Sequence, residues 1–290
     1  MSAAKISEYL YRILLPQLSP PGVAWLQKQL DNLKTEKEFY LAFSVAPRFT
    51  GKKSLNLSEA DLQEADSLRA GFNPKNWTAD QVARVLLVLA LPHETPETYV
   101  ATLNRVFSTA DLSELATLYA SLPLLPYPDL HIKRAAEGVR STMTQVFDAI
   151  ALNNPYPHDY LPEEAWNQMV VKSVFNVRPL YQIYGLDNRR NQALANIAID
   201  YAHERWAAGR TLTPELWRLV GPFLKPENRK DIQRLLSGSE EIQQQAAALA
   251  LSESNLPEAK ELLAQYPDLE KEIRNRNLTW EIIGQKAYTA

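Results

Sequence analysis

The chain has 290 residues, of which 46% are hydrophobic and 22% charged, and its formal net charge is -3. This is the composition of an ordinary globular protein of one or two domains, and we expect a single all-helical domain over residues 1–290. Nucleic acid is not an expected partner because no basic stripe is present, and zero cysteines exclude disulfides and thiolate metal sites.

The N-terminal segment lacks the continuous apolar stretch of a secretory signal. In "MSAAKISEYLYRILLPQL" the apolar residues are interrupted by Glu8 and Arg12. The longest apolar run, from Val85 to Leu91, is far shorter than the ~20 residues that a membrane-crossing helix needs. We therefore expect no membrane span and a cytoplasmic location.

Helix signals begin near the N-terminus, and no strand or hairpin pattern competes with them. "SPPGVAWLQKQLDNLK" places Val23, Leu26 and Leu30 at the three- and four-residue steps of one helix face. "SEADLQEADSL" starts at a Ser58 cap. "TADQVARVLLVLAL", starting at Thr78, is apolar on nearly every side and predicts a central helix.

Later segments repeat the same signals. "TPETYVATLNRVF" and "TPELWRLVGPFL" both predict a threonine cap followed by proline at the first helical position. "EEIQQQAAALALSES" mixes charge with small residues, which favours a solvated helix face. Roughly a dozen helices with short connections predict an all-α fold of stacked antiparallel helix pairs, α-solenoid-like as in HEAT and armadillo repeats, or an irregular helical bundle. No repeat of fixed period is evident.

The segment "NNPYPHDYLPEEAWNQMVVK", residues 153–172, is the least ordinary part of the chain. We expect it to leave one helix, run extended and re-enter a helix at Pro162. Its aromatic and amide side chains suit a pocket for a flat or amide-bearing ligand, and they equally suit a rigid corner in which every group is used structurally. The candidate residues here are Asn154, Tyr156, Tyr160, Trp166, Asn167, Gln168 and Lys172.

A second polar segment is "YQIYGLDNRRNQALA", residues 181–195. Gly185 breaks one helix, and Asp187 or Asn188 caps the next, which places Arg189 and Arg190 in its first turn. The helix dipole disfavours cations there, so we expect a partner for them, either acidic side chains of the protein or an anionic ligand.

The third segment is "IDYAHERWAAGR", residues 199–210, with Gly209 as the helix stop. Asp200, His203 and Glu204 share one helix face, an arrangement that suits a general base or part of a metal site. The alternative is structural, with His203 bonded to Asp200 and Glu204 paired to an arginine. No paired-histidine zinc motif, phosphate loop or nucleophile elbow is present, so we assign no catalytic residue, metal ligand or cofactor.

Several of these motifs together resemble a known family. "NNPYPHDYLPEEAWNQMVVKSVF", "YGLDNRRN", "DYAHERWAAGR" and "PELWRLVGPF" occur in the order and spacing of the EboA family of bacterial proteins, found in secondary-metabolite gene clusters of cyanobacteria and other bacteria. The earlier segments "NWTADQVARVLLVLAL" and "STADLSELATLYASLPLLP" are similar to it as well. The resemblance is strongest over residues 48–224.

The resemblance implies a metabolic context more than a reaction. Such clusters are linked to metabolites like the precursors of scytonemin, an indolic and phenolic pigment. We therefore expect a non-enzymatic helical scaffold or binding protein for metabolite transport, with an aromatic metabolite and other proteins of the same gene cluster as partners. An enzyme acting through Asp200, His203 and Glu204, and a pure protein-interaction solenoid, are the alternatives. The expected ligand-binding residues are Asn154, Tyr156, Tyr160, Trp166, Asn167, Gln168, Lys172, Asp187, Arg189, His203, Glu204, Arg205 and Trp206.

Overall fold

The computed structural model describes residues 3–33 and 35–289. Within these ranges the chain forms eighteen α-helices and seven short 3-10 helices, and no strand. The predicted all-α class is therefore confirmed. None of the described helices has the length and apolarity that crossing a membrane would require.

The helices form two compact units, residues 1–162 and 163–290, which are described separately. The single domain expected from the sequence remains a prediction. The boundary between the units falls inside the segment 153–172, so its candidate residues are divided between them.

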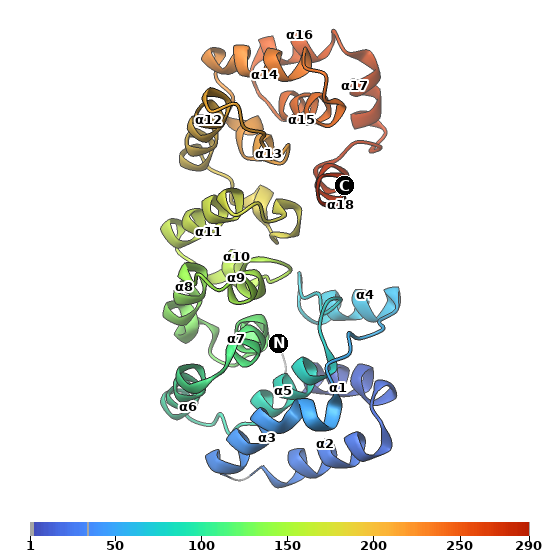
Figure 1. Ribbon diagram of the computed structural model, residues 1–290, viewed down its shortest axis with the longest axis vertical. Helices are drawn as coiled ribbons and strands as arrows, with labels where there is room; N and C mark the ends of the chain where they lie inside the picture. The colour runs from blue at the N-terminus through green and yellow to red at the C-terminus, as the bar shows by residue number, and fades with distance from the viewer. Residues whose placement is uncertain (1–2, 34, 290) are drawn as a thin grey trace. The chain divides into compact units, whose positions relative to one another are not determined.

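Unit 1 contains ten α-helices, drawn in blue to yellow-green in Figure 1. Their centre is α5, packed against α1, α2, α3 and α7, and all its residues except Gln81 are buried. The central helix predicted after Thr78 is therefore confirmed. The bounds are α1 Ala3–Leu14, α2 Pro20–Asn32, α3 Glu36–Thr50, α4 Glu59–Leu68, α5 Ala79–Leu89, α6 Pro96–Thr109, α7 Leu112–Ser121, α8 Ile132–Arg140, α9 Thr144–Ala151 and α10 Tyr156–Tyr160.

A buried ion cluster crosses the core of unit 1. Arg84 of α5 is 2% exposed and donates from Nη1 to Asp80 Oδ2 at 3.0 Å. Its Nη2 lies 3.7 Å from Glu114 Oε1 of α7, and its Nε donates to the Phe43 carbonyl of α3 at 3.0 Å. One guanidinium thus joins three helices and satisfies buried acceptors that would otherwise be costly.

Unit 2 contains eight α-helices, drawn in yellow to red in Figure 1. Its centre is α15, which packs against α13, α14, α16, α17 and α18. The bounds are α11 Glu163–Phe175, α12 Gln192–Ala207, α13 Leu216–Val220, α14 Arg229–Leu236, α15 Glu241–Ser252, α16 Pro257–Leu263, α17 Pro267–Arg274 and α18 Trp280–Thr289.

The solvated face expected for α15 is wrong. Every residue from Gln245 to Leu251 is buried, because five neighbouring helices surround this short run of alanine and leucine. Small side chains let the neighbouring backbones approach closely: a Cβ added at Gly221 would lie 3.0 Å from the Ala250 backbone. The alanines of α15 are therefore core residues and do not form a solvated face.

Two helix starts in unit 2 differ from expectation. Asn191, not Asp187 or Asn188, caps α12, and its side chain accepts the Leu194 N–H at 3.0 Å. The segment starting with Thr213 and Pro214 does not begin a helix; α13 starts at Leu216, and Glu215 turns inward instead. In both places a contact from elsewhere in the fold decides where the helix begins.

Candidate functional site

The candidate residues of unit 1 build a closed corner. The connector is not extended as expected, because residues 156–160 form the short helix α10. Asn154 is 3% exposed; its Nδ2 donates to the carbonyls of Tyr119 and Ala149 at 3.1 and 2.9 Å, and its Oδ1 accepts the Tyr156 N–H at 3.0 Å. Tyr156 is fully buried, donates to the Pro128 carbonyl at 2.5 Å and contacts Tyr160 with ring centroids 4.9 Å apart. The side chains of Asn154 and Tyr156 therefore bond to other parts of unit 1 and stabilise its fold.

Trp166 also belongs to the core, in unit 2. It is fully buried in the first turn of α11, and its Nε1 donates to the Arg189 carbonyl at 3.2 Å. The Arg189 guanidinium lies over the indole, with Cζ 4.7 Å from the ring centroid. Beside them Asn167 and Asn191 exchange amide hydrogen bonds of 2.9 and 3.4 Å. This arrangement fixes α11 against the N-terminal end of α12.

Three further candidate residues, Gln168, Lys172 and Asp187, each have different surroundings. Gln168 is exposed, and Lys172 is half-buried, which lowers the pKa of its ammonium. Asp187 accepts two hydrogen bonds from Arg218, at 2.7 and 2.8 Å. Burial acts to raise the pKa of Asp187, but the Arg218 bonds and charge outweigh it and hold that pKa below its usual range.

The partner expected for the arginine pair is partly acidic. Arg190 donates from Nη1 to Glu253 Oε2 at 2.6 Å and lies 3.5 Å from Asp187 Oδ1. Glu253 also accepts the Trp280 indole N–H at 3.0 Å. For Arg190 the acidic alternative is therefore confirmed, whereas Arg189 uses the Trp166 ring.

The acid/base trio is not assembled. His203 bonds through Nε2 to Asp231 Oδ1 of α14 at 2.9 Å, and not to Asp200. Asp200 and Glu204 are exposed and form no ion pair within the described ranges. Arg205, next to Glu204, donates instead to the Thr211 carbonyl at 3.0 and 2.8 Å. Among residues 3–33 and 35–289 no cluster of three His, Asp or Glu suits a metal ion.

Two groups of candidate residues in unit 2 lie at opposite ends of α12. Trp166 and Asn167 lie beside its N-cap, Asn191, whereas His203 and Trp206 lie in its last turns. A helix rises 1.5 Å per residue, so the two groups are on the order of 20 Å apart. The structure does not bring the Trp166 indole and the His203 imidazole into one hollow.

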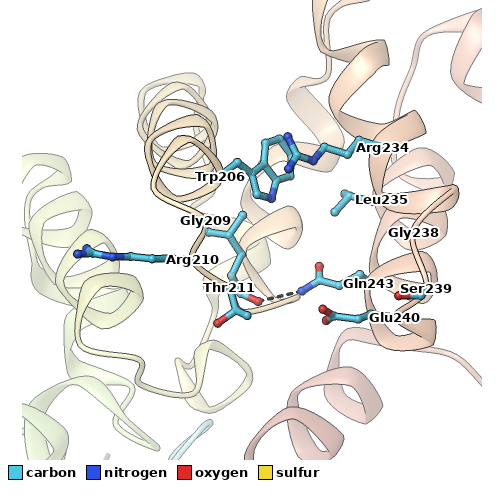
Figure 2. Close-up of a pocket in the computed structure, with 11 residues that line it drawn as sticks. Trp206, Gly209, Arg210, Thr211, Arg234, Leu235, Gly238, Ser239, Glu240 and Gln243 are labelled. Atoms are coloured by element: carbon cyan, nitrogen blue, oxygen red, sulfur yellow. Dashed lines mark hydrogen bonds between the residues drawn. The ribbon is translucent and has the colours of Figure 1, made fainter.

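A cavity of about 370 Å³ lies at the C-terminal end of α12. Its walls are Trp206, the following loop, the end of α14 and the α14–α15 turn (Figure 2). The loop geometry comes from Gly209, whose φ of 64° allows a tight stop in which the Arg210 N–H reaches the Arg205 carbonyl at 2.9 Å. This confirms the predicted helix stop and opens the space beyond it.

Trp206 is the aromatic wall of the cavity. It stacks on the fully buried Trp217 of α13, with ring centroids 5.7 Å apart and an interplanar angle of 24°. The Arg234 guanidinium lies over the Trp206 ring, with Cζ 4.4 Å from the centroid (Figure 2). Trp217 therefore holds the indole in place from the core, and a cation–π contact covers it from the surface.

Some polar groups that line the cavity have hydrogen-bond partners within the protein, and others do not. Gln243 donates from Nε2 to the Leu212 carbonyl at 2.8 Å, while its Oε1 is buried and has no hydrogen-bond partner. In Figure 2 that oxygen points upward, toward the space below Leu235. Arg234 and Glu240 are exposed and form no ion pair within the described chain, and Arg210 points away. The site offers an aromatic wall, a cation, a carboxylate and an unused acceptor.

The sequence predicts little of this cavity. Among its lining residues only Trp206 is an expected ligand-binding residue, and Arg234 and Gln243 are not. They follow no motif and reach the site only because α14 and α15 fold back against the end of α12.

In a comparison with protein families, the model described as metabolite traffic protein EboA matches residues 6–221. The match begins closer to the N-terminus than the motifs indicated. It includes the α12 side of the cavity and ends before the α14–α15 side. Searches of curated proteins and of solved structures gave no match.

Proposed function

The chain belongs to the EboA family of metabolite traffic proteins, and we propose that it binds an aromatic metabolite against Trp206 and hands it on without chemical change. The ligand class is an indolic or phenolic precursor of the kind from which scytonemin-type pigments are made. The observation that carries the proposal is the cavity of about 370 Å³ with an indole held on Trp217 at one wall.

The size and the lining of the cavity support this ligand class. A volume of 370 Å³ lies at the lower end of the roughly 300–1,000 Å³ typical of small-molecule sites. Aromatic ligands gain about 0.5–1.5 kcal/mol from ring contacts beyond the area that they bury. Arg234 is exposed and can turn aside to let a planar ligand reach the indole face.

The polar groups suit the hydrogen-bonding groups of such a ligand. Gln243 Oε1 is buried without a hydrogen-bond partner, and a turn of the side chain toward the cavity lets it accept a phenol O–H or indole N–H. Arg234 suits a ligand carboxylate. No histidine or aspartate lies in the described wall of the cavity, and its carboxylate, Glu240, is exposed.

The test is calorimetric titration of the full chain with 4-hydroxyphenylacetate and indole-3-acetate. We expect saturable binding of at least one of them, and Trp206→Leu should weaken it by roughly tenfold because the ring contact is lost. The matched control is Trp25→Leu: Trp25 is also half-buried and stacks on Phe49, with centroids 4.8 Å apart, but lies in unit 1.

Two further variants test the polar contacts. Gln243→Leu removes the buried acceptor, and Arg234→Gln removes the cation; each should weaken binding of the same aromatic acid several-fold. Arg274→Gln, an exposed arginine on α17, is the control for Arg234. Equal affinities of the Trp206 and Trp25 variants would contradict the proposed site, and absence of binding below millimolar concentration would contradict the ligand class.

A further inference from the structure

A second cavity in unit 2, of about 210 Å³, lies between the start of α14, the end of α15 and α16. Its walls are aliphatic, with no aromatic ring, and include Leu224, Ile232, Leu251 and Leu262, all buried. The volume is below the roughly 300 Å³ at which sites for drug-sized ligands begin, so its occupant is small.

Three charged side chains line the same cavity. Lys225 and Arg229 are cationic and Glu258 is anionic, and all three are exposed. Within the described residues none of the three forms an ion pair, either with another of them or with a further side chain. Arg229 opens α14, where the helix dipole disfavours a cation, so its charge is not compensated by its own helix either.

The cavity has aliphatic walls and carries charges of both signs that do not pair with each other. It is therefore complementary to a small molecule that has an aliphatic part and both a positive and a negative charge. Such a molecule has a carboxylate for the two cations, an ammonium for the carboxylate and a short aliphatic chain for the walls. A simple fatty acid leaves Glu258 without a charged partner, and a simple amine leaves Lys225 and Arg229 without one.

We propose that this cavity binds a small aliphatic α-amino acid of the leucine class. Its carboxylate lies at Lys225 and Arg229, its ammonium lies at Glu258, and its side chain contacts Ile232 and Leu251. The site is separate from the Trp206 cavity, since the two share no lining residue. It is therefore a second ligand site, independent of the proposed function.

The test uses saturation-transfer NMR of the full chain with L-leucine and two analogues that each lack one charge, 4-methylpentanoate and 3-methylbutylamine. We expect saturable leucine binding with a Kd of roughly millimolar or tighter, as suits so small a ligand. Each analogue should bind roughly fivefold or more weakly, the value of one ion pair at a partly exposed site.

Charge-removing variants assign each group to its partner. Glu258→Gln should weaken leucine by roughly fivefold and leave 4-methylpentanoate unchanged or tighter, whereas Arg229→Gln should weaken leucine and leave 3-methylbutylamine unchanged or tighter. All these side chains are exposed, so folding is not at risk. Glu261→Gln and Lys230→Gln are the controls, on the same helices but outside the cavity lining, and should bind leucine as the natural chain does.

Three outcomes overturn the proposal. One is the absence of saturable leucine binding, and a second is equal loss in the control variants. The third is loss of leucine binding in Trp206→Leu, which would place leucine in the other cavity. Retention of leucine binding in Trp206→Leu, together with loss in Glu258→Gln, supports the second site whether or not aromatic acids bind.

Discussion

Replacing Glu215 with glutamine should remove a pH dependence of unfolding that the buried carboxyl creates. Glu215 is fully buried before α13; its Oε2 accepts the Leu180 N–H at 2.9 Å, and its Oε1 has no hydrogen-bond partner among the described residues. Burial raises the pKa of Glu215 to about 7, although the Leu180 N–H and the charge of Arg218 act to lower it. Arg218 compensates incompletely because Asp187 already takes two of its N–H groups.

The sign of this pH dependence follows from how many protons the folded and unfolded chains bind. Between the ordinary pKa of 4.5 and the folded-state value of about 7, the folded protein holds a proton that the unfolded chain has lost. Stability therefore falls as the pH rises through this window, and levels off above it. A difference between 4.5 and about 7 corresponds to about 3 kcal/mol of the free energy of unfolding.

Glutamine keeps an acceptor for the Leu180 N–H and cannot ionise. Urea unfolding followed by tryptophan fluorescence should show similar stability of natural chain and Glu215→Gln near about pH 5, and an advantage of up to about 3 kcal/mol for the variant near about pH 8. Glu241→Gln, which alters an exposed carboxyl, is the control and should show no such change. The reasoning is refuted if the difference between natural chain and Glu215→Gln is the same at both pH values.

Three further substitutions test other parts of the fold. Arg84→Met should cost about 3–5 kcal/mol in urea unfolding, because Asp80 and Glu114 lose the cation buried between them; a loss below about 1 kcal/mol would contradict this. Asn154→Ala should lower stability by about 2–3 kcal/mol and leave affinity for aromatic acids unchanged, and weakened binding would show that the corner serves the ligand. Val177→Gly should stabilise by about 1 kcal/mol, since Val177 is exposed at φ 52°, where a β-branched residue is strained; a lower melting temperature would count against that strain.

The sequence predicts the parts of the fold that depend on local patterns. The Ser58 cap, the central helix after Thr78 and the stop at Gly209 are all present, because each is decided by a few adjacent side chains. The start of α13, in contrast, is not decided by adjacent side chains. Thr213 and Pro214 form a good local start, but Glu215 turns inward to hold Leu180, a contact distant in the sequence.

The candidate site is only partly predictable for the same reason. Trp206 and Trp166 look alike in the sequence, each in a polar helical segment. The structure covers Trp166 completely with Arg189 and its neighbours, while Trp206 keeps one side toward a cavity. Which tryptophan is available depends on packing partners from other helices. Likewise, the sequence of α15 predicts a solvated face. Its small residues are buried because five other helices surround them, and the local sequence does not show this.

The most direct measurement of the central claim is an NMR titration that observes the indole N–H signals of the six tryptophans. Trp206→Phe assigns the Trp206 signal, and 4-hydroxyphenylacetate is then added to the natural chain. A ligand in the cavity at the end of α12 should shift the Trp206 signal first and most, and leave that of the enclosed Trp166 in place. A saturating titration that moves the signal of Trp166 or Trp25 and not that of Trp206 would contradict the account.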